Sequence, residues 1–162
     1  TTEIYTLSLH DALPISTIEE KSLGAIVKSG TKPIRGVFSY GELPPRESGL
    51  YFVDSPGREP ELLAALAAAG CQAVLFSTGI GAPQGFPFMP VLKVSGNAET
   101  VNFLRDFIDI DVSAVLHSGE SLDDAGDRVL RETLETASGK KSRAEAMDYT
   151  GSTALYQTGP IV

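Results

Sequence analysis

The chain has 162 residues, a hydrophobic fraction of 42% and a formal net charge of −8. These values indicate one ordinary soluble globular domain, and the acidic balance argues against nonspecific binding to nucleic acid or to anionic membranes. Cys71 is the single cysteine, which excludes an intramolecular disulfide and a cysteine-based metal cluster and favours a cytoplasmic location.

The first sixteen residues resemble the translation of a common short-read sequencing adapter, whose codons give Ser8–Ile15 in frame without a mismatch. We therefore expect residues 1–16 to be non-native and exclude them from fold reasoning. Residues 17–162 are then expected to be the C-terminal portion of a catalytic domain whose upstream part is missing. No leader sequence is recognisable, and the longest alanine- and leucine-rich run, Leu62–Gly70, is too short to cross a bilayer.

Along residues 17–162, apolar spacing and turn residues predict alternating helices and strands. Helices are expected from Thr17 to Val27, over Glu59–Ala69, Asn97–Phe107 and Ser121–Ala137, with one more turn in Ala144–Tyr149. Strands are expected over Ile34–Phe38, Leu50–Val53, Ala73–Phe76, Val91–Val94, Val112–Leu116 and Ala154–Gln157. Continuous apolar strands alternating with helices predict an α/β fold, a partial Rossmann-like parallel sheet with helices on both faces.

In such a sheet the carboxyl ends of successive strands lie at one edge, which is the expected site. The turns Asp54–Gly57 and Thr78–Gly81 should therefore open on the same side. The loop from Gly79 to Gly85 lacks the glycine spacing of a dinucleotide fingerprint, and Pro83 prevents a helix from starting directly after it. Two interpretations stay open: the loop binds an anion through its amides and the Thr78 hydroxyl, or it is a purely structural turn.

Three charged residues are candidates for chemistry. Lys93 lies in an otherwise apolar strand, and lysine is rarely buried unless it is paired or functional. The alternative for Lys93 is an edge position where the ammonium group reaches solvent. Glu20 and Lys21 open the first helix, where a solvated first turn is the simpler explanation.

Several other polar residues have simpler explanations. Asp54 fits either a turn or an acid at the active-site edge, and Asn97 is explained as a helix N-cap. Asp106, Asp109 and Asp111 are explained by surface solvation more simply than by metal binding.

Residues 17–162 resemble the C-terminal part of the altronate dehydratase and galactarate dehydratase family. The resemblance is carried, in the order of the family, by segments Glu19–Gly24, Gly49–Tyr51, Asp54–Gly57, Ala69–Cys71, Phe76–Gly79, Pro90–Asn97 and Ala137–Lys140. It implies a lyase, more narrowly a hydro-lyase that removes water from a sugar acid to give a 2-keto-3-deoxy acid. It also implies a divalent metal, expected to be iron(II), with ligands that the sequence does not identify.

On this resemblance, Lys93 or Lys21 is the candidate for proton transfer and Glu20 a candidate acid or metal ligand. Thr78, Gly79 and Gly81, with Asp54 and Asn97, are the candidates for binding the substrate. The partners implied are a small sugar acid and the missing N-terminal part of the same enzyme, without nucleic acid or membrane. The fragment is expected to be inactive alone, and a homo-oligomer stays open.

The sequence departs from the family at Ile80, where the family usually has arginine, and at Ala82, where it has threonine. Isoleucine cannot bind a carboxylate as the arginine fork does, so the sequence does not say which sugar acid is used. Two alternatives stay open: a carbon–sulfur lyase related to sulfolactate sulfo-lyases, and a non-catalytic domain that binds sugar acids or contacts a subunit.

Overall fold

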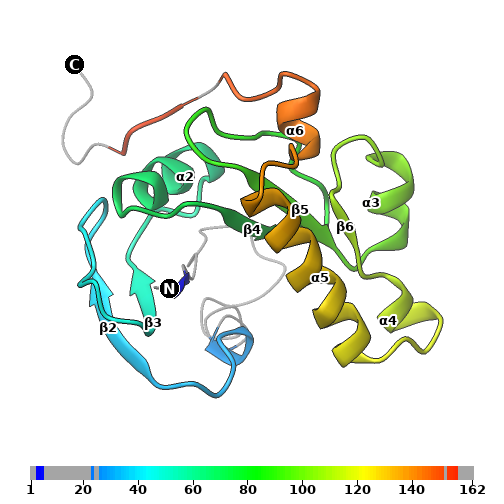
Figure 1. The fold of residues 1–162 in the computed structure, drawn as a ribbon, viewed down its shortest axis with the longest axis horizontal. Coiled ribbons are helices and arrows are strands. Elements are labelled where there is room, and N and C mark those ends of the chain that lie inside the picture. The colour runs from blue at the N-terminus through cyan, green and yellow to red at the C-terminus, as the bar shows by residue number, and fades with distance from the viewer. Residues whose placement is uncertain (1–2, 6–22, 24–25, 152, 157–162) are drawn as a thin grey trace. The chain divides into compact units, whose positions relative to one another are not determined.

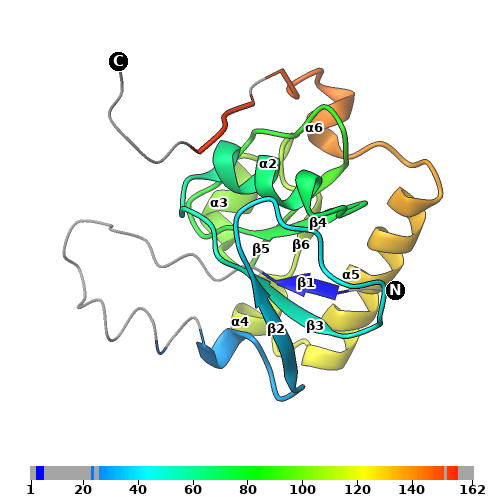
Figure 2. The ribbon, with the colours of Figure 1, turned by 90° about the vertical axis from the view of Figure 1, so that its left-hand side faces the viewer.

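The computed structural model describes residues 3–5, 23, 26–151 and 153–156, and the chain divides into two compact units. The first unit comprises residues 1–71 and 153–162, and the second comprises residues 72–152. Each unit contains a three-stranded parallel sheet. The strands are drawn as arrows in Figures 1 and 2. The α/β class with parallel sheets and flanking helices is therefore confirmed. No helix among the described residues is long and apolar enough to span a membrane.

The first unit is built around its central strand. Its elements are β1 (Glu3–Tyr5), β2 (Ile34–Phe38), β3 (Leu50–Val53) and α2 (Glu59–Ala68). The strand order is β1-β3-β2, and all four residues of β3 are buried, as its continuous apolar sequence predicts. Leu23 and residues 26–28 are helical, whereas Thr17, Glu20 and Lys21 lie outside the described residues.

Helix α2 agrees with the sequence prediction at both ends. Proline occupies its first turn, where the missing N–H group costs nothing. After the helix, Gly70 adopts a φ of +86°, and the Cys71 N–H group donates to the Leu66 carbonyl at 3.0 Å. Leu63 and Ala65 have no solvent exposure and supply the core beneath the helix.

The second unit has its sheet between helices. Its elements are β4 (Val74–Ser77), β5 (Val91–Ser95), α3 (Ala98–Phe103), β6 (Ile110–Asp111), α4 (Ala114–His117), α5 (Leu122–Ala137) and α6 (Arg143–Ala146). The strand order is β4-β5-β6, so β5 is central. Figures 1 and 2 together show α5 on one face of this sheet and α3 on the other.

The strands form two sheets, whereas the sequence suggested one. Strand β3 pairs with β1 along one edge and with β2 along the other, whereas β4 pairs with β5 in the second sheet. The turns Asp54–Gly57 and Thr78–Gly81 were expected at one edge of a single sheet. The two turns instead follow strands of different sheets.

Two strand predictions near the C-terminal half are wrong. The strand is Ile110–Asp111, and most of the predicted strand Val112–Leu116 is instead the start of α4. The Asp111 carboxylate accepts the Ser113 N–H group at 2.8 Å, and this local turn ends the strand. Residues 154–156 have no strand assignment, and the end of that predicted strand, residue 157, lies outside the described residues.

The half-buried Cys71 gives a test of the first unit. Burial raises the pKa of its thiol to about 11, from an ordinary value of 9.0. At pH 8 the native thiol should therefore react with iodoacetamide about 100-fold more slowly than the same thiol in urea-unfolded chain. Mass spectrometry of the alkylated chain measures the reaction at Cys71 alone, because the chain has one cysteine. Equal rates in the two states would contradict the described packing around α2.

Candidate functional site

Lys93 is the middle residue of β5, the central strand of the second sheet, and its side chain has no solvent exposure. Its Nζ atom lies 4.3 Å from the centroid of the Phe76 ring. Phe76 is its register partner on β4. Of the two alternatives left open by the sequence, the structure excludes the solvent-exposed edge position.

The Phe76 ring gives the ammonium group one favourable neighbour. A cation over the face of an aromatic ring gains about 2 kcal/mol when both groups are removed from water. Such a gain is smaller than the cost of burying an isolated charge, which requires further polar or charged neighbours.

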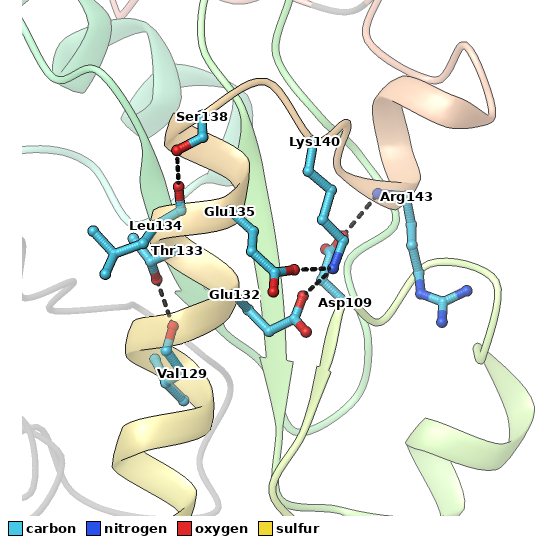
Figure 3. Close-up of polar contacts among 9 residues, drawn as sticks. All are labelled: Asp109, Val129, Glu132, Thr133, Leu134, Glu135, Ser138, Lys140 and Arg143. Carbon is cyan, nitrogen blue, oxygen red and sulfur yellow. Dashed lines mark hydrogen bonds and ion pairs between the residues drawn. The ribbon is translucent and has the colours of Figure 1, made fainter.

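Asp109 holds the main chain of Lys93. Its Oδ2 accepts the backbone N–H group of Lys93 at 2.7 Å, and its own N–H group donates to the Lys93 carbonyl at 3.0 Å. Its Oδ1 accepts the N–H group of Arg143 at 2.7 Å, whereas the Arg143 guanidinium points away from the carboxylate (Figure 3). The expectation of surface solvation is therefore wrong for Asp109, which is half-buried, while Asp106 and Asp111 are exposed as expected.

Opposing effects act on the Asp109 carboxyl group. Burial raises its pKa above the ordinary value of 3.8, and the N–H donors of Arg143 and Lys93 and the positive charges of the same residues partly offset this. The sequence missed Asp109 because its main partners, Lys93 and Arg143, lie far from it along the chain.

The turn that follows β4 is held by side chains from two segments. Thr78 Oγ1 accepts the Gly81 N–H group at 2.9 Å. The Gly79 carbonyl accepts the Asn97 side-chain amide at 3.0 Å and the Thr100 hydroxyl at 2.7 Å. The turn is thus fastened to the start of α3.

The Asn97 side chain bonds both to the turn and to the first residues of α3. Its Oδ1 accepts the N–H groups of Glu99 and Thr100, as the predicted N-cap requires, while its Nδ2 holds Gly79. Its backbone N–H group donates to Ser95 Oγ at 3.2 Å, and Ser95 is buried two residues beyond Lys93. The turn and the buried lysine therefore belong to one connected region of the second unit.

The backbone N–H groups that are available to a ligand in this turn are not all those that the sequence predicted. The Gly81 N–H group is used by Thr78, but among the described residues no acceptor is found for the N–H groups of Gly79 and Ile80. The Ile80 side chain is 92% exposed. Two neighbouring free amides can bind a carboxylate oxygen, so Gly79 and Ile80 are the better candidates for this role.

Of the remaining predicted site residues, the structure describes Asp54. Asp54 is exposed in the first unit, where its N–H group donates to the Phe38 carbonyl at 2.8 Å. Glu20 and Lys21 lie outside the described residues.

The described carboxylate, imidazole and thiol side chains do not assemble a metal site. Within the part of the chain that the structure describes, no three His, Cys, Asp or Glu side chains gather as metal ligands. The described residues therefore do not by themselves form the iron site that the resemblance implies.

Comparison with known proteins identifies the family. The sequence profile described as D-galactarate/altronate dehydratase, C-terminal, matches residues 12–161. The chain belongs to this family. Relatives include the (2R)-sulfolactate sulfo-lyase subunit beta of Chromohalobacter salexigens, with 40% identity over 83% of this chain, and the altronate dehydratases of Bacillus subtilis and Escherichia coli, with 38% and 34% identity over 90%.

The chain spans about a third of the length of these relatives or less. It covers 35% of the sulfo-lyase subunit, 29% of the B. subtilis dehydratase and 28% of the E. coli dehydratase. The residues that match the profile include the Thr78–Gly81 turn and Lys93.

The turn offers a test with a matched control. Gly81 has a φ of +101°, and a Cβ atom there would overlap the Leu104 side chain, so Gly81→Ala should destabilise the protein by at least about 2 kcal/mol. At Gly79 a Cβ atom meets nothing within 4 Å, and Gly79→Ala should change the free energy of unfolding by less than about 1 kcal/mol. Urea unfolding measures the free energy of unfolding of both variants. Equal losses of stability in the two variants would contradict the described turn.

Proposed function

We propose that this chain is the sugar-acid lyase domain of a longer enzyme and that it removes water from a hydroxy acid to give a 2-keto-3-deoxy acid. Family membership supports the reaction class. The observation that carries the assignment to residues is the fully buried Lys93, next to a turn that offers the free amides of Gly79 and Ile80. A buried lysine beside a carboxylate-binding turn suits proton transfer on an acid substrate.

In this reaction the C–H bond next to the carboxylate and the C–O bond on the adjacent carbon both break. The proton goes to a base, the hydroxide leaves with a proton from an acid, and the resulting enol becomes the 2-keto acid. The amides of Gly79 and Ile80 would bind the carboxylate while negative charge develops on it. Lys93 would carry one of the proton transfers, and substrate entry must then uncover its Nζ atom, which is closed to solvent.

The proposal includes partners outside the described residues. A divalent metal, expected to be iron(II), would take ligands from elsewhere in the longer polypeptide, with Glu20 as a candidate. The 162-residue chain alone would then be inactive. A cytoplasmic location belongs to the same proposal and is supported by the single cysteine.

A second candidate is elimination of sulfite rather than water. The observation in its favour is the 40% identity to a protein named as a sulfolactate sulfo-lyase subunit. The same proton abstraction serves both reactions, and only the leaving group differs. Assays should therefore measure 2-keto acid and sulfite in parallel, with altronate, galactarate and sulfolactate as substrates.

The test of the lysine is Lys93→Met in the complete enzyme. We expect kcat to fall at least about 100-fold, because a proton-transfer group is lost while the apolar length of the side chain is kept. Lys140→Met is the matched control: Lys140 is exposed and pairs with Glu132 and Glu135 at 2.6 and 2.8 Å, so its loss should change kcat less than about twofold.

Turnover by Lys93→Met at the wild-type rate would remove Lys93 from the mechanism. Tight binding of sugar acids without product from the complete wild-type protein would instead support the non-catalytic binding domain.

A further inference from the structure

The Gly79 carbonyl, in the turn after β4, is held by two side chains from the start of α3. It accepts the Asn97 side-chain amide at 3.0 Å and the Thr100 hydroxyl at 2.7 Å. The two donors lie 18 and 21 residues further along the chain, and Thr100 is buried. Long-range contacts with α3 therefore set the direction of this carbonyl.

The planarity of the peptide bond carries this restraint to the Ile80 N–H group. The Gly79 carbonyl and the Ile80 N–H group belong to one peptide unit, and in a trans unit the two bonds point in opposite directions. The donors on the carbonyl side therefore direct the N–H group away from themselves. For this N–H group no acceptor is found among the described residues.

Residue 79 itself restrains this peptide unit little. Glycine has wide backbone freedom, and an added Cβ atom at Gly79 would meet nothing within 4 Å. A full reversal of the unit needs a positive φ at Ile80, which β-branched residues avoid. The hydrogen bonds of Asn97 and Thr100 therefore act against the smaller rotations that remain.

We propose that Asn97 and Thr100 are positioning residues for the substrate: through the Gly79 carbonyl they direct the Ile80 N–H group at the substrate carboxylate. The inference rests on the proposed function, in which the Gly79 and Ile80 N–H groups bind that carboxylate. The two hydrogen bonds also polarise the peptide unit, which makes the Ile80 N–H group a stronger donor to an anion. Asn97 and Thr100 thus contribute to substrate binding without touching the substrate.

The competing explanation is that Asn97 and Thr100 only fasten the loop and start α3. Under that explanation, loss of the Thr100 hydroxyl lowers the free energy of unfolding. It leaves the direction of the Ile80 N–H bond and the kinetics of the folded enzyme unchanged. A measurement of bond direction in the folded chain therefore separates the two explanations.

The experiment measures N–H residual dipolar couplings, which report bond directions, by NMR of the isotope-labelled 162-residue chain. Thr100→Val removes the hydroxyl and keeps the methyl group that lies next to Gly81. The Ile80 coupling, scaled to those of Val91 and Leu92 on β5, should fall by about a third or more, because the N–H bond then samples more directions. Thr100→Ser keeps the hydroxyl and should restore the wild-type coupling.

Thr133→Val is the matched control. The Thr133 hydroxyl on α5 donates to the Val129 carbonyl at 2.7 Å, the same length as the bond of Thr100 to Gly79 (Figure 3). Its loss should leave the Ile80 coupling unchanged. An unchanged Ile80 coupling in Thr100→Val, or an equal change in Thr133→Val, would overturn the proposal.

Asn97→Ser gives a second measurement if Thr100→Val does not fold. Serine caps a helix about as well as asparagine but has no amide group for the Gly79 carbonyl. The Ile80 coupling should again fall, and the proposal is wrong if it does not.

Kinetics of the complete enzyme test the step from the turn to the substrate. A poorly directed hydrogen bond to the carboxylate should lower kcat/KM about tenfold in Thr100→Val, whereas Thr100→Ser and Thr133→Val should stay within about twofold of wild type. Altered couplings with unchanged kcat/KM would overturn the role in substrate binding and count against the carboxylate-binding turn of the proposed function. Unchanged couplings would overturn the positioning role alone, and Lys93→Met tests proton transfer separately.

Discussion

The constraint on which the second unit depends is the charge of Lys93 inside its central strand. A buried ammonium group is costly unless its surroundings compensate for it, and the Phe76 ring on β4 supplies part of this compensation. The Asp109 carboxylate, directly before β6, holds the main chain of Lys93. Because Asp109 also holds the start of α6, the packing of that helix depends on the same carboxylate. Lys93 and Asp109 together thus link β4, β5, β6 and α6.

Local signals in the sequence were sufficient for much of the fold. The apolar run Leu50–Val53 became a buried central strand, and the proline and glycine around Glu59–Ala68 marked both ends of a helix. The N-cap role of Asn97 was also predictable, since it depends only on residues two and three positions away. Each of these features depends on residue types within a short segment of the chain, so the sequence alone is enough to predict it.

Features that depend on distant partners were not predictable. Asp109 looked like one of three surface carboxylates, and only folding brings Lys93 and Arg143 to its oxygens. The Gly81 amide looked free for a ligand, but Thr78 uses it, and this left Gly79 and Ile80 as the available donors. The division into two sheets likewise depends on which distant strands pair, and no single segment of the sequence determines the strand order.

The hydrogen bonds of the Thr78–Gly81 turn have a consequence for how such a protein diverges. Thr78, Asn97 and Thr100 hold the turn, and the side chain of Ile80 takes no part in this and projects into solvent. Position 80 can therefore exchange an apolar residue for a charged one in a single mutational step without rebuilding the loop. Proteins with this turn can therefore change the side chain offered to a ligand at position 80 while the fold of the turn is kept.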